Sequence, residues 1–176
     1  MTTKASEPPD PADPDADPES VARTIALRML DSQPRTRLEL ERAMARRDVP
    51  SDVAAAVLDR FTEVGLVDDE AFAQAWVDSR HRGRGLAKRA LSAELRRRGV
   101  DDSVVREAVD TVTDDDERAA AASLVERKLR TMSSLSRDVQ TRRLLGMLAR
   151  KGFGHAVAMT AVREALAANA APLDAP

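Results

Sequence analysis

Residues that could carry out catalytic chemistry are few in this sequence and are not grouped. It has no cysteine, and so offers neither a thiolate nucleophile nor thiolate metal ligands. His81 and His155 are 74 residues apart, and a metal site around either would need carboxylates that no motif marks. The acidic runs at 68–70 and 114–117 precede helical patterns, where negative charge favours a helix start. We therefore expect a protein that is not an enzyme and that has no cofactor and no metal.

Arginines are the residues in this chain best suited to binding. From Ser79 to Arg98 there are eight basic residues and one acid, Glu94, which gives this stretch a net charge of +7. Elsewhere basic residues alternate with acids, and missing acids leave self-repulsion that a negatively charged partner would relieve. The planar guanidinium group suits phosphate and carboxylate recognition. The predicted partner-binding residues are Arg80, Arg82, Arg84, Lys88, Arg89, Arg96 and Arg97. The alternative is a solvated helix face, which single surface arginines usually form.

The net charge of −2 hides two acidic ends around a basic centre. Residues 1–20 sum to −5, whereas residues 21–168 sum to +4. Because residues 1–19 are rich in proline and acids, we expect a disordered tail there, and residues 169–176 form a second, flexible tail. An acidic tail that competes for the basic segment would make deletion of residues 1–18 tighten partner binding.

The composition predicts an all-α protein. Alanine, leucine, arginine and glutamate are abundant, whereas the chain has one tryptophan, three phenylalanines and no tyrosine. No segment approaches the roughly 18 consecutive apolar residues of a membrane span, and the acidic, proline-rich start is unlike a secretory signal. We therefore expect a cytoplasmic protein, and we expect a monomer.

Apolar spacing with start and stop signals predicts nine helices. A capping box opens the second at Thr36 and Glu39. Ser51 is the predicted cap of the third, whose buried stripe ends at Val64 before Gly65. Asp68 is the predicted cap of the fourth. A loop around Gly83 and Gly85 should then separate the fourth helix from the fifth, over residues 86–98, with Ala87, Leu91 and Leu95 buried.

Three stretches of the chain resemble one another at residues 40–53, 91–104 and 144–157, at offsets of 51 and 53 residues. In each, a leucine is followed four residues later by an apolar residue. A basic residue then closes the helix and is followed directly by a turn residue, and a valine five residues after the turn residue belongs to the next helix. The turn residues are Asp48, Gly99 and Gly152, all tolerant of the left-handed region. The period predicts three tandem three-helix repeats, at 20–66, 67–112 and 113–168, stacked into a curved, elongated array.

The region around the basic segment closely resembles the RecX family. The matching residues are GLV at 65–67, VDDEAFA at 67–73, Trp76-Val77, Arg80, GRG at 83–85 and ELRRRGV at 94–100. The resemblance covers about residues 20–168, and the combined motif is fairly specific. Two positions depart from the family pattern: Leu86 stands where proline is frequent, and Asp48 stands where glycine is usual. Both affect turn geometry, and neither removes a charged group.

This resemblance implies a regulator of the recombinase RecA. Proteins of this family bind the RecA filament on single-stranded DNA and lower its ATPase and strand-exchange activity, with roles in DNA repair, recombination and the SOS response. Direct but weaker DNA binding is a further expectation. Phe72 and Trp76, four apart on one helix face, are expected in the core rather than stacked on bases. Two alternatives stay open: a stand-alone helix-turn-helix DNA-binding regulator that uses helix 86–98, and a purely structural helical scaffold.

Overall fold

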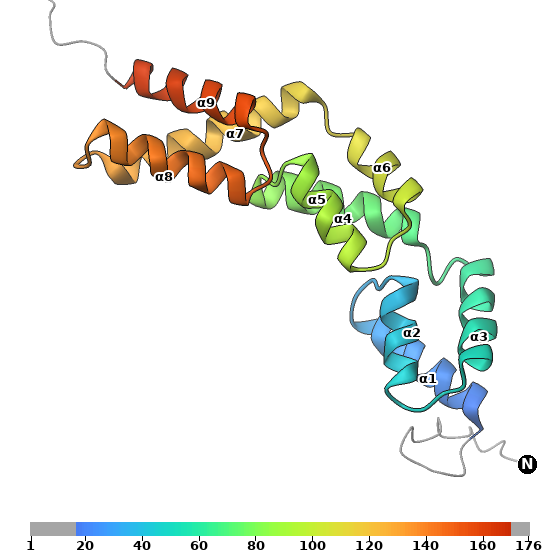
Figure 1. The fold of residues 1–176 in the computed structure, drawn as a ribbon. Helices are drawn as coiled ribbons and strands as arrows, with labels where there is room; N and C mark the ends of the chain where they lie inside the picture. Colours follow the sequence, from blue (N-terminus) through green and yellow to red (C-terminus); the bar gives the residue numbers. More distant parts are fainter. Residues whose placement is uncertain (1–16, 170–176) are drawn as a thin grey trace, which may run out of the picture. The chain divides into compact units, whose positions relative to one another are not determined.

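The computed structural model describes residues 17–169, and these form helices and connecting turns with no strand (Figure 1). The described helices are α1 (Pro18–Ser32), α2 (Arg37–Ala45), α3 (Ser51–Glu63), α4 (Asp69–Arg84), α5 (Lys88–Arg97), α6 (Asp102–Asp110), α7 (Asp114–Leu129), the 3-10 turn η1 (Arg130–Met132), α8 (Arg137–Arg150) and α9 (His155–Ala168). The all-α prediction is confirmed. Among residues 17–169, no helix combines the length and the apolar character needed to cross a bilayer.

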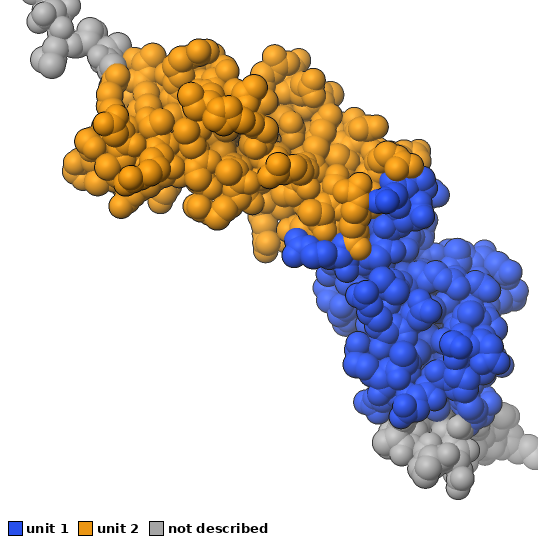
Figure 2. All heavy atoms as spheres, viewed as in Figure 1, with its two compact units in different colours: residues 1–73, 97–104 blue, residues 74–96, 105–176 orange. Residues whose placement is uncertain are grey.

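The chain divides into two compact units, coloured in Figure 2. Unit 1 comprises residues 1–73 and 97–104, and unit 2 comprises residues 74–96 and 105–176. The division passes through α4, α5 and α6, the helices of the middle repeat. In unit 1 the core between α1, α2 and α3 is built on Leu40, Met44 and Leu58, whereas in unit 2 α7, α8 and α9 enclose Val125, Leu144 and Leu148.

Several sequence-predicted helix starts need correction, whereas the capping box at Thr36 and Glu39 is confirmed. The first helix begins at Pro18 rather than near Ser20, because Asp17 accepts the Ser20 amide (3.0 Å) and proline suits the first helical position. The predicted tail at 1–19 is therefore too long at its end, and its residues 1–16 lie outside the described part of the chain. So do residues 170–176 of the predicted C-terminal tail.

The third helix differs from the prediction at both ends. Its N-cap is Pro50, so Ser51 is already the first helical residue and makes no capping hydrogen bond. The helix ends at Glu63, and Val64, just beyond it, is 55% exposed rather than part of the buried stripe. Asp68 does cap the fourth helix, since its carboxylate accepts the Ala71 amide (2.8 Å).

Inside unit 1, residues of the second repeat form hydrogen bonds with the start of α2. The Thr36 hydroxyl donates to the carbonyl oxygen of Arg98 (2.7 Å), and the Arg37 amide donates to the Asp69 carboxylate (2.9 Å). The next residue, Gly99, has φ of +85°, and a Cβ added there would overlap the Leu38 side chain. The end of α5 and the start of α4 are therefore fitted closely against the start of α2.

Inside unit 2, residues of the third repeat form similar hydrogen bonds with the start of α5. The Ala87 amide donates to the carbonyl oxygen of Lys151 (3.0 Å), and the Lys88 amide donates to the Glu117 carboxylate (2.7 Å). Gly152 has φ of +89°, and a Cβ there would lie 2.6 Å from the Ala90 nitrogen. The residues before and at the helix starts are 51 apart and the two carbonyl residues are 53 apart, as in the sequence repeat, whereas the two acids are 48 apart. Similar contacts therefore join successive repeats.

Candidate anion-binding surface

The predicted basic residues lie on the end of α4 and along α5. The predicted loop around Gly83 is shorter than expected, because the Gly85 amide still donates to the His81 carbonyl (2.8 Å) and α4 continues to Arg84. Arg80, Arg82 and Arg84 are therefore all helical. In α5 the expected stripe is confirmed, since Leu91 and Leu95 are fully buried, as is Ala87 just before the helix.

Arg80 differs from the other predicted contacts because it is packed against its own unit. Its guanidinium carbon lies 4.0 Å from the centroid of the Trp76 ring, and its Nε lies 3.9 Å from a Glu94 carboxylate oxygen. The indole nitrogen of Trp76 donates to the same carboxylate (2.9 Å). Only 24% of the Arg80 side chain is exposed. The one acid of the basic segment is thus engaged on this side of α5.

Two further predicted residues have acidic neighbours that lie outside the basic segment in sequence. Arg82 is 3.4 Å from the Asp78 carboxylate, one turn earlier on α4. Lys88 is 3.6 Å from Asp114 at the start of α7. Both pairs are exposed on at least one side, so each contributes little to stability. Acids missing from the local sequence are therefore partly supplied by the fold.

The remaining predicted residues are exposed on the surface. Within residues 17–169, the side chains of Arg84 and Arg89 form no ion pair and are exposed. Arg96 is also exposed and belongs to unit 2, whereas Arg97 is exposed in unit 1. The candidate surface of unit 2 therefore consists of Arg82, Arg84, Arg89 and Arg96, with Lys88 at its edge; we call these five residues the basic surface.

Lys151 joins Arg84 in the structure, although sequence reasoning did not select it as a site residue. Its ammonium group donates to the Arg84 carbonyl at the end of α4. Partial burial lowers the pKa of Lys151, and the guanidinium groups of Arg127 and Arg84 lower it further. The positive charge at this end of α4 therefore comes from three helices. The only sequence signal was the basic residue that precedes the turn residue in each repeat.

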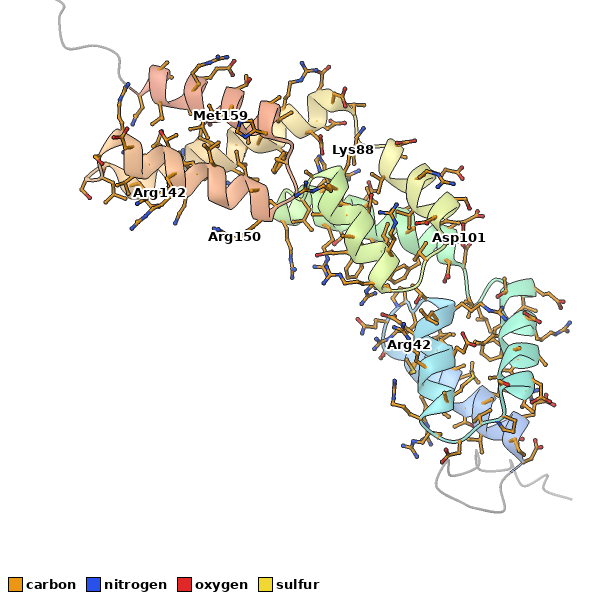
Figure 3. All side chains as sticks on the ribbon, in the orientation of Figure 1. Arg42, Lys88, Asp101, Arg142, Arg150 and Met159 are labelled. Carbon is orange, nitrogen blue, oxygen red and sulfur yellow. The ribbon has the colours of Figure 1, made fainter. Side chains whose placement is uncertain are left out.

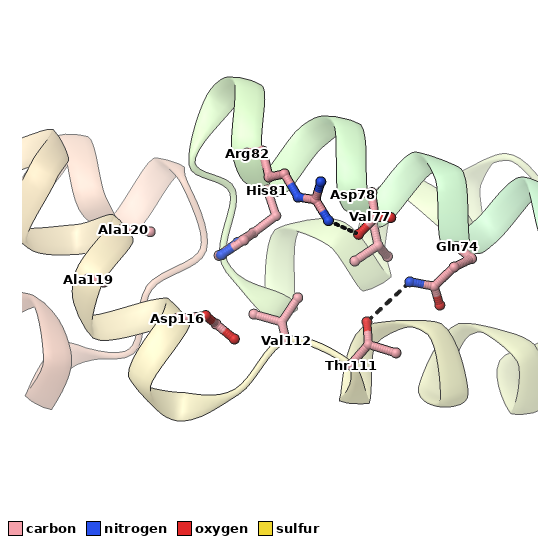
Figure 4. A pocket seen from close by; sticks show the side chains of 10 residues that line it. All are labelled: Gln74, Val77, Asp78, His81, Arg82, Thr111, Val112, Asp116, Ala119 and Ala120. Atoms are coloured by element: carbon pink, nitrogen blue, oxygen red, sulfur yellow. Dashed lines mark hydrogen bonds and ion pairs between the residues drawn. The ribbon is translucent and has the colours of Figure 1, made fainter.

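A cavity of about 420 Å³, lined by polar and apolar side chains alike, lies beside α4 in unit 2 (Figure 4). His81 extends into it towards Asp116, and its Nδ1 lies 2.9 Å from the Leu86 carbonyl oxygen. The Gln74 amide donates to the Thr111 hydroxyl (3.4 Å) on the far side of the cavity. Among residues 17–169, no three His, Asp or Glu side chains are placed to hold a metal ion.

Phe72 and Trp76 take different positions. Phe72 is 8% exposed, as expected for a core residue, and the Arg98 guanidinium lies 5.1 Å from its ring. Trp76 is only partly buried, with Arg80 over one ring face. That contact makes the Trp76 ring a support for Arg80.

Profiles of three known domains match the three repeats in order. They are RecX, first three-helix domain, at residues 22–61, RecX, second three-helix domain, at residues 68–109, and RecX, third three-helix domain, at residues 115–162. The chain belongs to the RecX family. The matches also confirm three tandem three-helix units, a fold that the sequence repeats alone predicted.

Curated relatives and solved structures agree with this assignment. The chain is 54% identical to "Regulatory protein RecX" of Thermobifida fusca, over 88% of this chain and 84% of the relative. It is 51% identical to the protein of the same name from Streptomyces coelicolor, over 88% and 82%. A crystal structure of RecX from Lactobacillus salivarius superposes with a TM-score of 0.76 at 22% identity, covering 86% and 98% of the two chains, and so supports the fold. As a RecX protein the chain is regulatory and not an enzyme.

Proposed function

We propose that this RecX protein binds the RecA filament assembled on single-stranded DNA and lowers its ATPase and strand-exchange activities. The protein acts in the cytoplasm, as a monomer and without a cofactor. The observation that carries the proposal is the exposure of Arg82, Arg84 and Arg89 at the junction of α4 and α5, in a member of the RecX family.

The basic surface suits a partner that carries many negative charges. Arg84 and Arg89 have no ion-pair partner among residues 17–169, and Arg82 has only an exposed one, Asp78. Their guanidinium groups can therefore turn to an incoming phosphate or carboxylate with little to give up. A filament of protein on DNA presents both kinds of anion in a regular array, so several arginines can bind at once.

Arg80 and Lys88 have a supporting role in this proposal. Arg80 is held between Trp76 and Glu94, and the Lys88 amide donates to the Glu117 carboxylate, so each of these two residues is held against its own unit. Rigid placement of the exposed arginines lowers the entropy lost when they bind. Arg96 and Arg97 extend the charge along α5.

The decisive measurement is the ATPase rate of RecA on single-stranded DNA as this protein is titrated in. We expect inhibition by the wild-type chain, and at least about tenfold weaker inhibition by the triple variant Arg82→Glu, Arg84→Glu, Arg89→Glu, because several phosphate or carboxylate contacts become repulsive. The matched control reverses three other exposed arginines, Arg28, Arg106 and Arg130, which changes the net charge equally.

Three outcomes would contradict the proposal. They are no inhibition by the wild-type chain at stoichiometric concentration, equal loss in both triple variants, and a lowered unfolding midpoint that accounts for the loss. Tight, sequence-selective binding to bare DNA in the absence of RecA would instead favour a stand-alone DNA-binding regulator.

A further inference from the structure

A second surface of unit 2 has a different character from the basic surface. It is a groove of about 360 Å³ between α8 and α9. Its apolar part is formed by Met159, Val162 and Leu166 of α9, and Met159 is 42% exposed although it is a large apolar residue (Figure 3). Exposed apolar side chains that line a concave surface are typical of sites that bind a partner.

The charged residues that line this groove are all positive. Arg137 comes from α8 and Arg163 from α9, and none of the described lining residues is an acid. Arg137 also donates to the Leu166 carbonyl (3.0 Å), which fixes its side chain across the end of the groove. An occupant that matches this surface combines an apolar side chain with negative charge.

In the first two repeats, a carboxylate accepts a backbone amide at the start of the second helix. Asp69 binds the Arg37 amide at the start of α2, and Glu117 binds the Lys88 amide at the start of α5. Each acid comes from the repeat that follows. At the start of α8, Ser136 makes no side-chain capping bond, and within residues 17–169 no carboxylate from another helix accepts the Arg137 amide.

We propose that the groove between α8 and α9 binds a protein segment in which an apolar side chain lies next to one or two carboxylates. The apolar side chain packs on Met159 and Leu166, above Val162, which is 2% exposed, and the carboxylates bind Arg137 and Arg163. We take this segment to belong to the protein subunits of the RecA filament rather than to DNA. The identity of the partner therefore rests on the proposed function. The basic surface and the groove then make separate contacts with one filament.

The absence of cysteine from the chain allows a direct test of what fills the groove. A benzophenone maleimide attached to Thr141→Cys places a photoreactive group at the groove wall, and Ser123→Cys, exposed on α7 outside it, is the control. The probe is RecA assembled on single-stranded DNA with a slowly hydrolysed ATP analogue. We expect a cross-link from position 141 to a RecA peptide that contains Asp or Glu beside an apolar residue, and little from position 123.

A cross-link to residues 170–176 of the same chain, to a second copy, or to DNA would overturn the proposal. So would equal cross-linking from both positions, or none from position 141.

Affinity provides an independent measurement. Met159→Glu places a negative charge on the apolar wall, and we expect at least about tenfold weaker binding to the filament, because repulsion replaces an apolar contact. Leu27→Glu, an exposed leucine in unit 1, is the matched control and should bind like the wild type. Circular dichroism and urea unfolding show whether either variant is folded.

The two proposals fail in different ways. A wild-type chain that neither binds nor inhibits RecA removes both. A chain that inhibits RecA normally with Met159→Glu in place removes only the groove, and the function proposed for the basic surface stands.

Discussion

The carbonyl oxygen of Lys151 accepts a hydrogen bond from the Ala87 amide (3.0 Å), and so joins the end of α8 to the residue just before α5. In unit 1 the Arg98 carbonyl accepts from the Thr36 hydroxyl (2.7 Å) at the equivalent place. In both cases the residue that follows is a glycine with positive φ, pressed against the earlier repeat. The repeat signature of the sequence therefore marks the contacts between successive repeats, and we call each such contact a joint.

The joint predicts that Gly152 does not tolerate a side chain. Alanine at φ of +89° costs about 1–2 kcal/mol, and forcing a Cβ to 2.6 Å from the Ala90 nitrogen adds about 1–3 kcal/mol. We expect Gly152→Ala to lower the free energy of unfolding by about 2–4 kcal/mol in urea titrations. Gly146→Ala is the control, since Gly146 lies inside α8 and alanine there should stabilise by up to about 1 kcal/mol. Equal effects of the two changes would show that the joint is loose.

The same geometry predicts opposite effects at two equivalent turns. Asp48 has φ of +57° and is exposed. Asp48→Gly should stabilise by about 0.5–1 kcal/mol because it relieves the left-handed conformation. Gly99→Asp should destabilise by about 2 kcal/mol or more, since its Cβ overlaps Leu38. Thermal unfolding of both variants tests this, and destabilisation by Asp48→Gly would contradict it.

Two carboxylates are expected to change stability with pH in opposite directions. Burial raises the pKa of Asp69, only partly offset by its bond from the Arg37 amide, so the folded state favours its protonated form. The stability it provides is present below the unfolded pKa and is lost as the pH rises through the raised folded value. Asp69→Asn should therefore unfold like the wild type in strong acid and be more stable at neutral pH. A variant less stable at neutral pH would mean that the bond to Arg37 outweighs burial.

Asp116 is the opposite case. Hydrogen bonds from the Thr113 hydroxyl and amide lower its pKa, so its contribution is present above the unfolded pKa and is lost as the pH falls through the folded value. Asp116→Asn should be less stable than the wild type at neutral pH, and the difference should vanish in acid. Urea midpoints measured between pH 2.5 and 7 for both variants check the signs, and a constant difference would exclude ionisation as the cause.

The packing of Arg80 predicts that it acts on stability rather than directly on the partner. Removing its guanidinium loses the contact with Trp76 and leaves Glu94 without one neighbour, so Arg80→Ala should cost about 1–2 kcal/mol. Arg84→Ala should change the free energy of unfolding by less than about 0.5 kcal/mol and should weaken filament binding. Denaturation and binding measured on both variants separate the two roles, and a loss of binding without destabilisation in Arg80→Ala would contradict the assignment.

The sequence by itself determined the helical class, the order of the three repeats and the segment that carries the excess arginines. These depend on local properties: helix propensity, apolar spacing, caps such as Thr36 with Glu39, and turn residues such as Gly99. It misplaced features that depend on where a helix stops, as at Val64 and Gly83, because hydrogen bonds between successive turns decide that point.

Only the tertiary structure showed that the basic residues have different surroundings. Arg80 packs against Trp76, and Lys88 meets Asp114, which is 26 residues further along the chain, because folding brings distant charges together. It also added Lys151 beside Arg84 and showed that Asp48, unlike Gly99 and Gly152, stands at an exposed turn. The sequence gives the number and order of the charged residues. The distances between their charges depend on how helices that are far apart in the sequence pack together.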